Sequence, residues 1–280
     1  MILNLDKSFD PLEGKKIAHE SFFFSGGEPH IRIKESINSD KVIITQRLNS
    51  FNDVGILLVA VDALKRLGVK KMELFIPYFP AARQDRVMVK GEALTVKVYA
   101  NLINELQVEK VTIFDPHSEV TSALLNHCKI INNHRFISKI TEQLPKDLLL
   151  VSPDAGALKK IYKLASHLKE YDVLECGKSR DVITGALSGF KVPQKNLAQR
   201  DCLIVDDICD GGGTFLGLAE ELKKCHSGNL YLAVSHGIFS KGTHNLLKSF
   251  KSIFTTDSIK NPGTEGINFI TIKEIINHEI

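Results

Sequence analysis

The stretch from Cys202 to Thr214, CLIVDDICDGGGT, decides the fold, because it joins an apolar run to three consecutive glycines. Residues 202–205 are short and apolar and predict a buried strand, and residues 215–224 predict a helix. Glycine allows a sharp turn that brings several N–H groups close to one anion, and the N-terminus of the following helix favours the same anion. Thr214 adds a hydroxyl group. The stretch therefore predicts a strand, a phosphate-binding turn and a helix in succession.

Two adjacent acidic residues, Asp206 and Asp207, stand between this strand and the glycines. Their carboxylates can accept hydrogen bonds from sugar hydroxyls or contact a hydrated magnesium ion. A glycine-rich turn that only caps a helix would leave both carboxylates at the end of a buried strand without a partner. A phosphorylated sugar would satisfy the acids and the glycine turn together, so the segment predicts a phosphosugar site.

The chain alternates short apolar runs with stretches of helical periodicity. The expected strands are 72–76, 111–114, 148–151, 202–205 and 230–234, and the expected helices are 53–67, 94–106, 157–168 and 215–224. Strands that alternate with helices favour parallel sheets, so we expect an α/β fold. Ligands of such sheets bind beyond the carboxyl ends of the strands, and polar residues follow the expected strands at Arg83, Arg86, Asp115, His117, Asp154, Asp206, Asp207 and Asp210.

Composition narrows the class of protein. The 280 residues carry a net charge of +3 from 36 basic and 33 acidic residues, which favours neither a nucleic-acid partner nor a membrane surface. No apolar run is long enough to span a membrane, and the N-terminus does not resemble a secretory signal. Five cysteines without CxxC spacing indicate reduced thiols rather than disulfides or a zinc site. We expect a soluble, cytoplasmic protein.

Four shorter segments each allow a functional and a structural interpretation. Arg83, Gln84 and Arg86 supply donors suited to polyphosphate and adenine edges, or they form a surface salt-bridge cluster with Asp85. A lone histidine such as His117 is more often structural. The segment SPDAG at 152–156 is also a common start of a helix, and GKSR at 177–180 taken alone is a solvated loop. The residues by themselves leave these alternatives open.

The order of the motifs resembles a known family. An apolar strand, two acids and DxGGT are similar to the phosphoribosyl diphosphate signature, which type I phosphoribosyltransferases and ribose-phosphate pyrophosphokinases share. IPYFPAARQDR at 76–86 resembles the pyrophosphokinase segment IPYFxYARQDR, which the transferases lack. FSGGE at 24–28 resembles FSDGE, and DPHS at 115–118 resembles DLHA. SPDAG is similar to SPDxGG, GKSR aligns with DKRR, and SHGIFS at 235–240 is similar to THxIFS.

This resemblance implies two phosphoribosyltransferase-like domains, each with a mainly parallel sheet flanked by helices. Residues 1–137 would form the domain with the ATP-binding motifs, and residues 138–280 the domain for ribose 5-phosphate with the catalytic loop. The implied reaction transfers diphosphate from ATP to the anomeric hydroxyl of ribose 5-phosphate and gives 5-phosphoribosyl 1-diphosphate and AMP. The resemblance also implies Mg²⁺ as cofactor and a homo-oligomer, a dimer or larger.

Each matching motif implies a role for its residues. Lys178 and Arg180 would be the catalytic cations on a flexible hood, although Gly177 and Ser179 depart from the family pattern. ATP would be bound by Phe24, Gly26, Glu28, Arg83, Gln84, Asp85 and His117, with Gly26 in place of the family's aspartate. Ribose 5-phosphate would be bound by Arg180, Asp206, Asp207, Asp210, Gly211, Gly212, Gly213 and Thr214. His117 and Asp154 would help to hold the metal.

Two other functions stay open at this point. A type I phosphoribosyltransferase would consume phosphoribosyl diphosphate with a base, and ARQDR and GKSR argue against it. A non-catalytic regulatory homologue would keep the fold and bind a partner enzyme, and the departures at Gly26, Gly177 and Ser179 are consistent with it.

Overall fold

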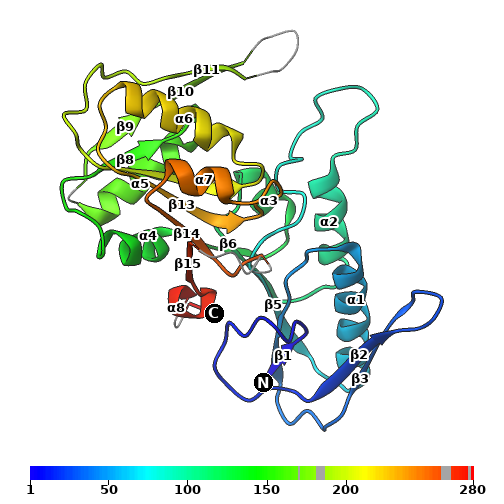
Figure 1. Cartoon of the computed structure of the whole chain (residues 1–280). Helices are drawn as coiled ribbons and strands as arrows, with labels where there is room; N and C mark the ends of the chain where they lie inside the picture. Colours follow the sequence, from blue (N-terminus) through cyan, green and yellow to red (C-terminus); the bar gives the residue numbers. More distant parts are fainter. Residues whose placement is uncertain (170, 181–186, 260–265, 277–278) are drawn as a thin grey trace. The chain divides into compact units, whose positions relative to one another are not determined.

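The computed structural model describes residues 1–169, 171–180, 187–259, 266–276 and 279–280, without the side chains of 178–180 and 187–188. The chain forms two compact α/β units (Figure 1). Unit 1 contains Met1–Asn132 and the C-terminal residues from Thr271, and unit 2 contains Asn133–Asp257 and the last strand, β15 (Ile267–Ile270). The expected α/β fold with two domains is confirmed.

The sheet of unit 1 is parallel and has the strand order β1-β4-β5-β6-β7. Its strands are β1 (Ile2–Asn4), β4 (Lys41–Thr45), β5 (Lys71–Ile76), β6 (Lys110–Phe114) and β7 (Cys128–Ile131). The helices α1 (Phe51–Arg66), α2 (Thr95–Asn104) and α3 (Glu119–Leu124) connect successive strands from β4 onward. Because each strand pairs with the next one along the chain, the carboxyl ends of β5 and β6 are neighbours at one edge of the sheet.

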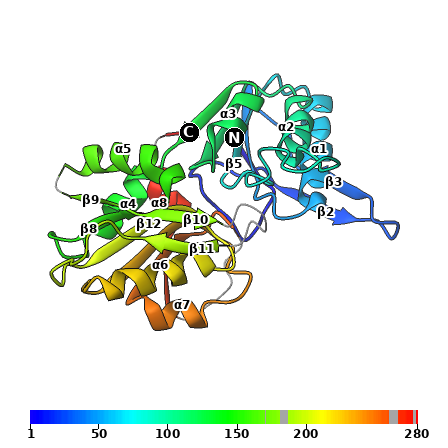
Figure 2. The ribbon, with the colours of Figure 1, turned by 90° about the horizontal axis from the view of Figure 1, so that it is seen from above.

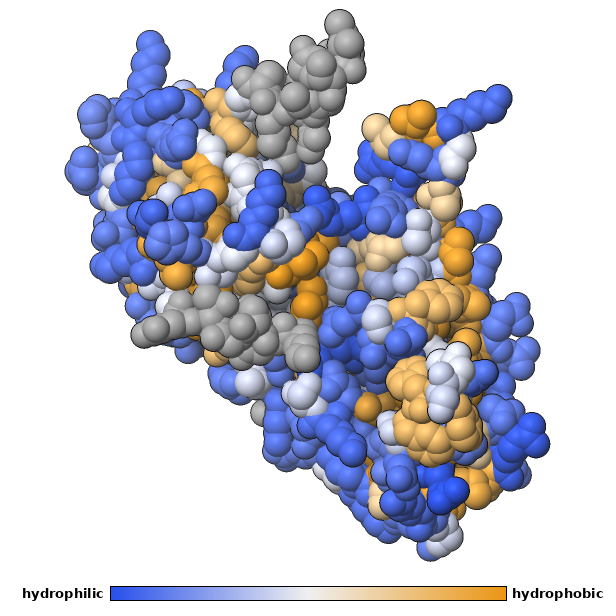
Figure 3. Space-filling model, turned by 45° about the vertical axis from the view of Figure 1, so that its right-hand side comes forward, coloured by the Kyte–Doolittle hydropathy of each residue, from blue (hydrophilic) through white to orange (hydrophobic). Residues whose placement is uncertain are grey.

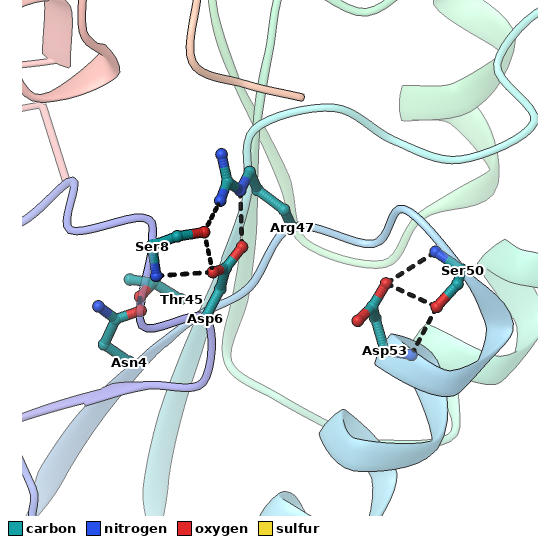
Figure 4. Close-up of polar contacts among 7 residues, drawn as sticks. All are labelled: Asn4, Asp6, Ser8, Thr45, Arg47, Ser50 and Asp53. Carbon is teal, nitrogen blue, oxygen red and sulfur yellow. Dashed lines mark hydrogen bonds and ion pairs between the residues drawn. The ribbon is translucent and has the colours of Figure 1, made fainter. Parts of the chain in front are cut away.

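Helix α1 shows how local sequence sets these elements. Ser50 and Asp53 form a capping box, in which the Asp53 N–H donates to the Ser50 hydroxyl and the Ser50 N–H donates to the Asp53 carboxylate (Figure 4). The side chains that the helix buries recur at helical spacing: Val54, Leu57, Val61 and Leu64. The helix ends at Arg66, and Gly68 follows with a φ of 83°. The expected helix 53–67 is confirmed.

The N-terminal segment packs on β5 without a helix of its own. The ring of Phe9 is fully buried and stacks on Phe75, and the guanidinium of Arg47 lies over Phe9. Arg47 also donates to the carboxylate of Asp6 and to the hydroxyl of Ser8 (Figure 4). Burial raises the pKa of Asp6, but Arg47 and Ser8 outweigh it and hold that pKa below its ordinary value. This cluster fixes the segment that leads from β1 to the hairpin of β2 (His19–Phe23) and β3 (Pro29–Ile33).

Unit 2 has a six-stranded parallel sheet in the order β15-β14-β13-β12-β8-β9. The strands before β15 are β8 (Leu149–Ser152), β9 (Val173–Glu175), β12 (Cys202–Cys209), β13 (Leu230–Gly237) and β14 (Ser252–Thr256). Figure 2 shows α4 (His134–Thr141) and α5 (Leu158–Leu168) on one side of the sheet and α6 (Gly213–Lys224) and α7 (His244–Ser249) on the other. A separate antiparallel pair consists of β10 (Gly177–Arg180) and β11 (Leu187–Lys191).

Several boundaries differ from the sequence-based expectations. The units divide between Asn132 and Asn133, so a division after residue 137 would fall inside α4. The residues from Thr271, including α8 (Ile272–Ile276), belong to unit 1, where Lys273 pairs with Glu13. Strand β12 extends to Cys209 rather than ending at Val205. In the described parts of the chain, no helix combines the length and apolar character that crossing a lipid bilayer requires.

Candidate active site

The order in which the chain adds strands to the sheet of unit 2 reverses between β8 and β12. From β8 the chain adds β9 on one side and then returns to place β12 on the other, where β13 and β14 follow. Ligands of open parallel sheets bind at the carboxyl ends of strands where the order reverses in this way. Asp154 follows β8, and Asp206 and Asp207 lie in β12 beyond Ile204, the last residue of β12 paired with β8. The acidic residues therefore surround the switch point of the sheet.

Asp206 lies among other carboxylates. Its pKa is raised well above the ordinary value, first because burial disfavours the charged form and then because Asp207 and Asp154 add negative charge. The N–H of Asp207 donates to the Oδ1 atom of Asp206 at 2.9 Å, which acts in the opposite direction but does not outweigh these effects. Such a group of acids gains from hydroxyl donors or from a cation. This is the chemistry expected of a sugar or metal site.

Asp154 is held by the turn that follows β8. It caps the short helix η1 (Ala155–Ala157), and its Oδ1 atom accepts hydrogen bonds from Gly156 N at 2.9 Å and Ala157 N at 3.3 Å. The Ser152 hydroxyl donates to the carbonyl oxygen of Asp154 at 3.0 Å. The SPDAG segment therefore is the start of a helix, as its structural interpretation holds, and it also brings Asp154 close enough to Asp206 to raise the pKa of Asp206.

The three glycines form the turn between β12 and α6. Gly212 adopts the left-handed conformation with φ of 76° and stands at the N-cap of α6, whose first residue is Gly213. A Cβ atom on Gly212 would lie 3.1 Å from a methyl carbon of Leu246, so both the backbone and the space favour glycine here. Beside the turn, the Ser240 hydroxyl donates to the Asp210 carboxylate. The turn predicted from the sequence is therefore present, with the N-terminus of α6 directed at it.

Lys178 and Arg180 lie on a strand rather than in an irregular loop. In β10, Lys178 pairs with Phe190 and Arg180 pairs with Leu187 of β11, and the register shifts between Ser179 and Arg180. The expected flexible hood is therefore a β-ribbon with an irregularity next to Arg180. Residues 181–186, which join its two strands, lie outside the described part of the chain.

In unit 1 the structure brings ARQDR and DPHS together. Asp85 is buried with 8% of its surface exposed, and it accepts a hydrogen bond from Arg86 Nε at 3.1 Å. Burial raises the pKa of Asp85, but Ser118, Arg86 and His117 together hold it below the ordinary value. The salt-bridge interpretation is therefore correct for Asp85 and Arg86. Arg83, Gln84 and His117 are exposed around this pair, where they can meet a ligand.

FSGGE occupies the turn of the β2–β3 hairpin. The Phe24 N–H donates to the Glu28 carbonyl oxygen at 2.9 Å, and the Phe24 ring lies 5.1 Å from Phe22 and 5.5 Å from His30. A Cβ on Gly26 would lie 2.6 Å from the Glu28 carboxylate, so the family's aspartate would displace Glu28. Figures 1 and 2 show the hairpin projecting beside α1, away from β5 and β6. Phe24, Gly26 and Glu28 are thus not brought to Asp85 and His117 within the unit.

The hairpin contributes apolar surface. Phe23 and Phe24 are 44% and 53% exposed, and on α1 Phe51 is 60% exposed. Figure 3 shows apolar surface of this kind among the hydrophilic residues of unit 1. Exposed aromatic rings can stack on a planar ligand or pack against another protein surface.

Comparison with known proteins agrees with this geometry. Residues 10–106 match the N-terminal domain of ribose phosphate pyrophosphokinase, and residues 121–269 match the phosphoribosyl transferase domain. The ribose-phosphate pyrophosphokinase of Mycoplasma pneumoniae is 35% identical over 222 residues, which cover 78% of this chain and 67% of that protein. The chain belongs to the ribose-phosphate pyrophosphokinase family.

Other members of the family match nearly the whole chain. The ribose-phosphate pyrophosphokinase of Saccharolobus solfataricus is 28% identical over 263 residues, which cover 92% of this chain and 89% of that protein. The crystal structure of phosphoribosylpyrophosphate synthetase from Mycobacterium smegmatis superposes with a TM-score of 0.80 at 21% identity and covers 94% of this chain and 88% of that one. This likeness confirms the fold of a ribose-phosphate pyrophosphokinase.

The structure adds neighbours that the family motifs did not assign. Ser240 and Lys241 lie against the glycine turn, although about thirty residues separate them from it along the chain. Asn133 and Lys160 line a small cavity of about 20 Å³ that Asp206 and Asp207 also line. Ser240 lies inside the SHGIFS motif, which matches the family pattern but had no role assigned to its residues. The other three carry no motif, and only long-range packing places them here.

Proposed function

We propose that this chain is a ribose-phosphate pyrophosphokinase that transfers diphosphate from ATP to the anomeric hydroxyl of ribose 5-phosphate. The products are 5-phosphoribosyl 1-diphosphate and AMP. The observation that carries the proposal is the group of Asp154, Asp206 and Asp207 beside the glycine turn of unit 2. This arrangement suits a ligand with hydroxyls at one end and a phosphate at the other.

Unit 2 would bind the acceptor. Asp206 and Asp207 accept hydrogen bonds from the ribose hydroxyls, and the backbone of Gly211–Gly213 with the Thr214 hydroxyl holds the 5-phosphate. Asp210 belongs to the same turn, and its hydrogen bond with Ser240 orients its carboxylate. Because β12 extends past its pairing with β8, the two acids are held on a strand rather than on a loop. A site held on strands keeps its groups in position better than one held on loops.

The acidic residues of unit 2 fit Mg²⁺ in its hydrated form. Among the described residues, no group of three or more His, Cys, Asp or Glu side chains converges as a complete metal cage. Mg²⁺ keeps several waters and binds through one or two carboxylates together with substrate phosphates, so a cage is not required. The raised pKa of Asp206 also indicates excess negative charge that a cation would offset. When bound, Mg²⁺ would supply charge compensation for the diphosphate. Asp154 is the residue of unit 2 that we assign to the metal, and His117 is the residue of unit 1 that we assign to it.

Unit 1 would bind the diphosphate donor. Arg83 and Gln84 supply exposed donors for ATP, and Asp85 is held by Arg86 next to His117. Phe24, Gly26 and Glu28 would contribute to nucleotide binding from the hairpin turn. In-line transfer requires donor and acceptor to be oriented and the charge on the moving phosphoryl oxygens to be compensated. Lys178 and Arg180 are the cations that we assign to this compensation, and Arg180 would also contact ribose 5-phosphate.

The oligomeric state and the cellular location are further parts of the proposal. We propose a homo-oligomer, a dimer or larger, because the hairpin with FSGGE projects from unit 1 with exposed aromatic residues. We also propose that the enzyme works in the cytoplasm, which the five free cysteines support, because reduced thiols are usual there.

The deciding experiment measures AMP formation from ATP and ribose 5-phosphate without any nucleobase, with and without Mg²⁺ and inorganic phosphate. We expect Mg²⁺-dependent AMP formation. A phosphoribosyltransferase would give none, and a regulatory homologue would bind nucleotide without forming AMP.

Lys178→Ala should reduce turnover on the order of 10²-fold, as loss of one charge-stabilising group does. Lys191→Ala, on the partner strand β11, is the control. If Lys178→Ala kept wild-type turnover, the catalytic assignment of Lys178 would be wrong.

A further inference from the structure

Hydrogen bonds hold the loop after β13 against the start of the glycine turn of unit 2. The N–H groups of Ile238 and Phe239 both donate to the carbonyl oxygen of Cys209, at 2.8 and 3.1 Å. The Ser240 N–H donates to the Asp210 carbonyl oxygen at 3.2 Å, and the Ser240 hydroxyl donates to the Asp210 carboxylate. Four hydrogen bonds thus join three consecutive residues of this loop to the end of β12. The next residue, Lys241, is therefore held in a defined place.

The side chain of Lys241 lies over Gly211. A Cβ atom on Gly211 would be 3.4 Å from Cδ and 3.5 Å from Cε of Lys241, so the methylene chain of the lysine packs on the turn. A turn closes behind it, because the Gly242 N–H donates to the Phe239 carbonyl oxygen at 2.8 Å. Lys241 is exposed to solvent. Within the described part of the chain, its ammonium group forms no ion pair.

The position of Lys241 matters because the glycine turn and the residues before it are acidic. The segment from Asp206 to Phe215, DDICDGGGTF, contains three aspartates and no lysine or arginine. A phosphate monoester carries nearly two negative charges near neutral pH, and Asp210 lies within the turn that would hold it. Backbone N–H groups and the N-terminus of α6 supply only partial positive charge. A full positive charge next to the glycines would offset the repulsion from Asp210.

We propose that Lys241 is a further binding residue for the phosphate group of the acceptor substrate. This inference rests on the proposed function, because it deepens the role given to the glycine turn. The matching family motif ends at Ser240, so the resemblance assigns nothing to Lys241. The alternative is that the methylene chain of Lys241 only shields Gly211 from solvent, in which case its charge would not matter.

Lys241→Met separates these two roles, because methionine keeps an apolar side chain of similar length over Gly211 and removes the charge. We expect the KM for ribose 5-phosphate to rise about tenfold, the size of one charge-assisted hydrogen bond, while the KM for ATP and the kcat stay within about twofold. Lys241→Arg should restore most of the affinity. Lys248→Met on the exposed face of α7 removes the same charge nearby and is the matched control.

Ribose without its phosphate gives the decisive comparison. The ratio of kcat/KM for ribose 5-phosphate to that for ribose should fall in Lys241→Met, because the lysine acts only on the phosphate. An unchanged KM for ribose 5-phosphate, or an equal rise in the KM for both substrates, would overturn the inference.

Direct binding distinguishes this failure from failure of the proposed function. Calorimetry with ribose 5-phosphate alone, and with inorganic phosphate as competitor, needs no turnover. If the wild type formed no AMP but bound ribose 5-phosphate about tenfold more tightly than Lys241→Met, the pyrophosphokinase proposal would fail and the role of Lys241 would stand. If the wild type bound neither ligand, or if both proteins bound equally, the role of Lys241 would be refuted.

Discussion

The two units place an aspartate at the carboxyl end of a parallel sheet in opposite electrostatic surroundings. In unit 1, Asp85 has Arg86, Ser118 and His117 around it, and its pKa is lowered although burial acts against this. In unit 2, Asp206 is partly buried next to Asp207 and Asp154, and its pKa is raised. One unit therefore holds a compensated carboxylate and the other holds a crowded one.

This difference indicates how each site would treat a ligand. The carboxylate of Asp85 already accepts a hydrogen bond from Arg86, so it can hold the ARQDR segment in place while its exposed donors would face the ATP phosphates, as proposed above. The carboxylates around Asp206 repel one another, and hydroxyl donors or a cation would relieve that repulsion. Unit 1 thus has a site stabilised in advance, whereas unit 2 has a site that gains stability when it is occupied.

Replacement of the crowded carboxylate should separate activity from stability most strongly. Asp206→Asn removes one acceptor for the ribose hydroxyls, so we expect kcat/KM for ribose 5-phosphate to fall about 100-fold. The same change removes a repulsive charge, so the melting temperature of the free protein should stay the same or rise. Steady-state assays and thermal unfolding without ligand measure the two effects.

The matched control for this prediction is Asp201→Asn, which lies in the same sheet at the amino-terminal end of β12 and bonds Asn229. It should lower stability and leave the KM for ribose 5-phosphate unchanged. A clear loss of stability in Asp206→Asn would mean that Asp206 is a structural residue and that the contrast between the units is false.

The compensated carboxylate of unit 1 should behave in the opposite way. Asp85→Asn weakens hydrogen bonds to charged and polar partners, so we expect the free energy of unfolding to fall by about 1 to 2 kcal/mol. The KM for ATP should rise as Arg86 and the neighbouring ARQDR residues lose their support. Urea unfolding and ATP titration measure these changes, with the exposed Asp62→Asn on α1 as a control. Unchanged stability would show that the Asp85 cluster forms without benefit to the fold.

The sequence predicted the parts of this contrast that depend on local pattern. Helical periodicity and capping predicted α1, and apolar runs predicted β5, β6, β8 and β13. The glycine turn was predicted because left-handed backbone at Gly212 and the start of α6 both have local signals. The apolar runs also predicted polar residues just after the strands, which holds for Asp154 after β8, whereas Asp206 lies inside β12.

The rest depends on contacts between distant segments. Strand β12 runs on through Asp206 and Asp207 because β13 pairs with it as far as Gly237, and no local pattern shows this. The ribbon of β10 and β11 carries GKSR, which has no apolar alternation to predict a strand. Lys241 reaches Gly211 only through the loop after β13. The C-terminal helix α8 joins unit 1 across the whole of unit 2 in sequence, which a break after residue 137 could not anticipate.

The pH dependence of stability has opposite signs for the two aspartates. Asp206 has a folded pKa above its ordinary value of 3.8, so the folded state takes up a proton first and becomes more stable as the pH falls toward 3.8. Asp85 has a folded pKa below 3.8, so its contribution is complete above that value and is lost as the pH falls through the folded pKa.

Two difference curves isolate these opposite slopes from the other carboxylates of the chain. Urea unfolding between about pH 3 and pH 7 should show that the free energy of unfolding of the wild type rises on acidification, and Asp206→Asn should lack this rise. The expected size is about 1.4 kcal/mol for each unit of difference between the folded and unfolded pKa. Asp85→Asn should lack part of the loss at the acidic end. Saturating ribose 5-phosphate with Mg²⁺ should abolish the first difference, because the ligand would hold Asp206 ionised, and leave the second in place. If ligand removed both differences or neither, the two aspartates would not stand in the separate environments that distinguish the units.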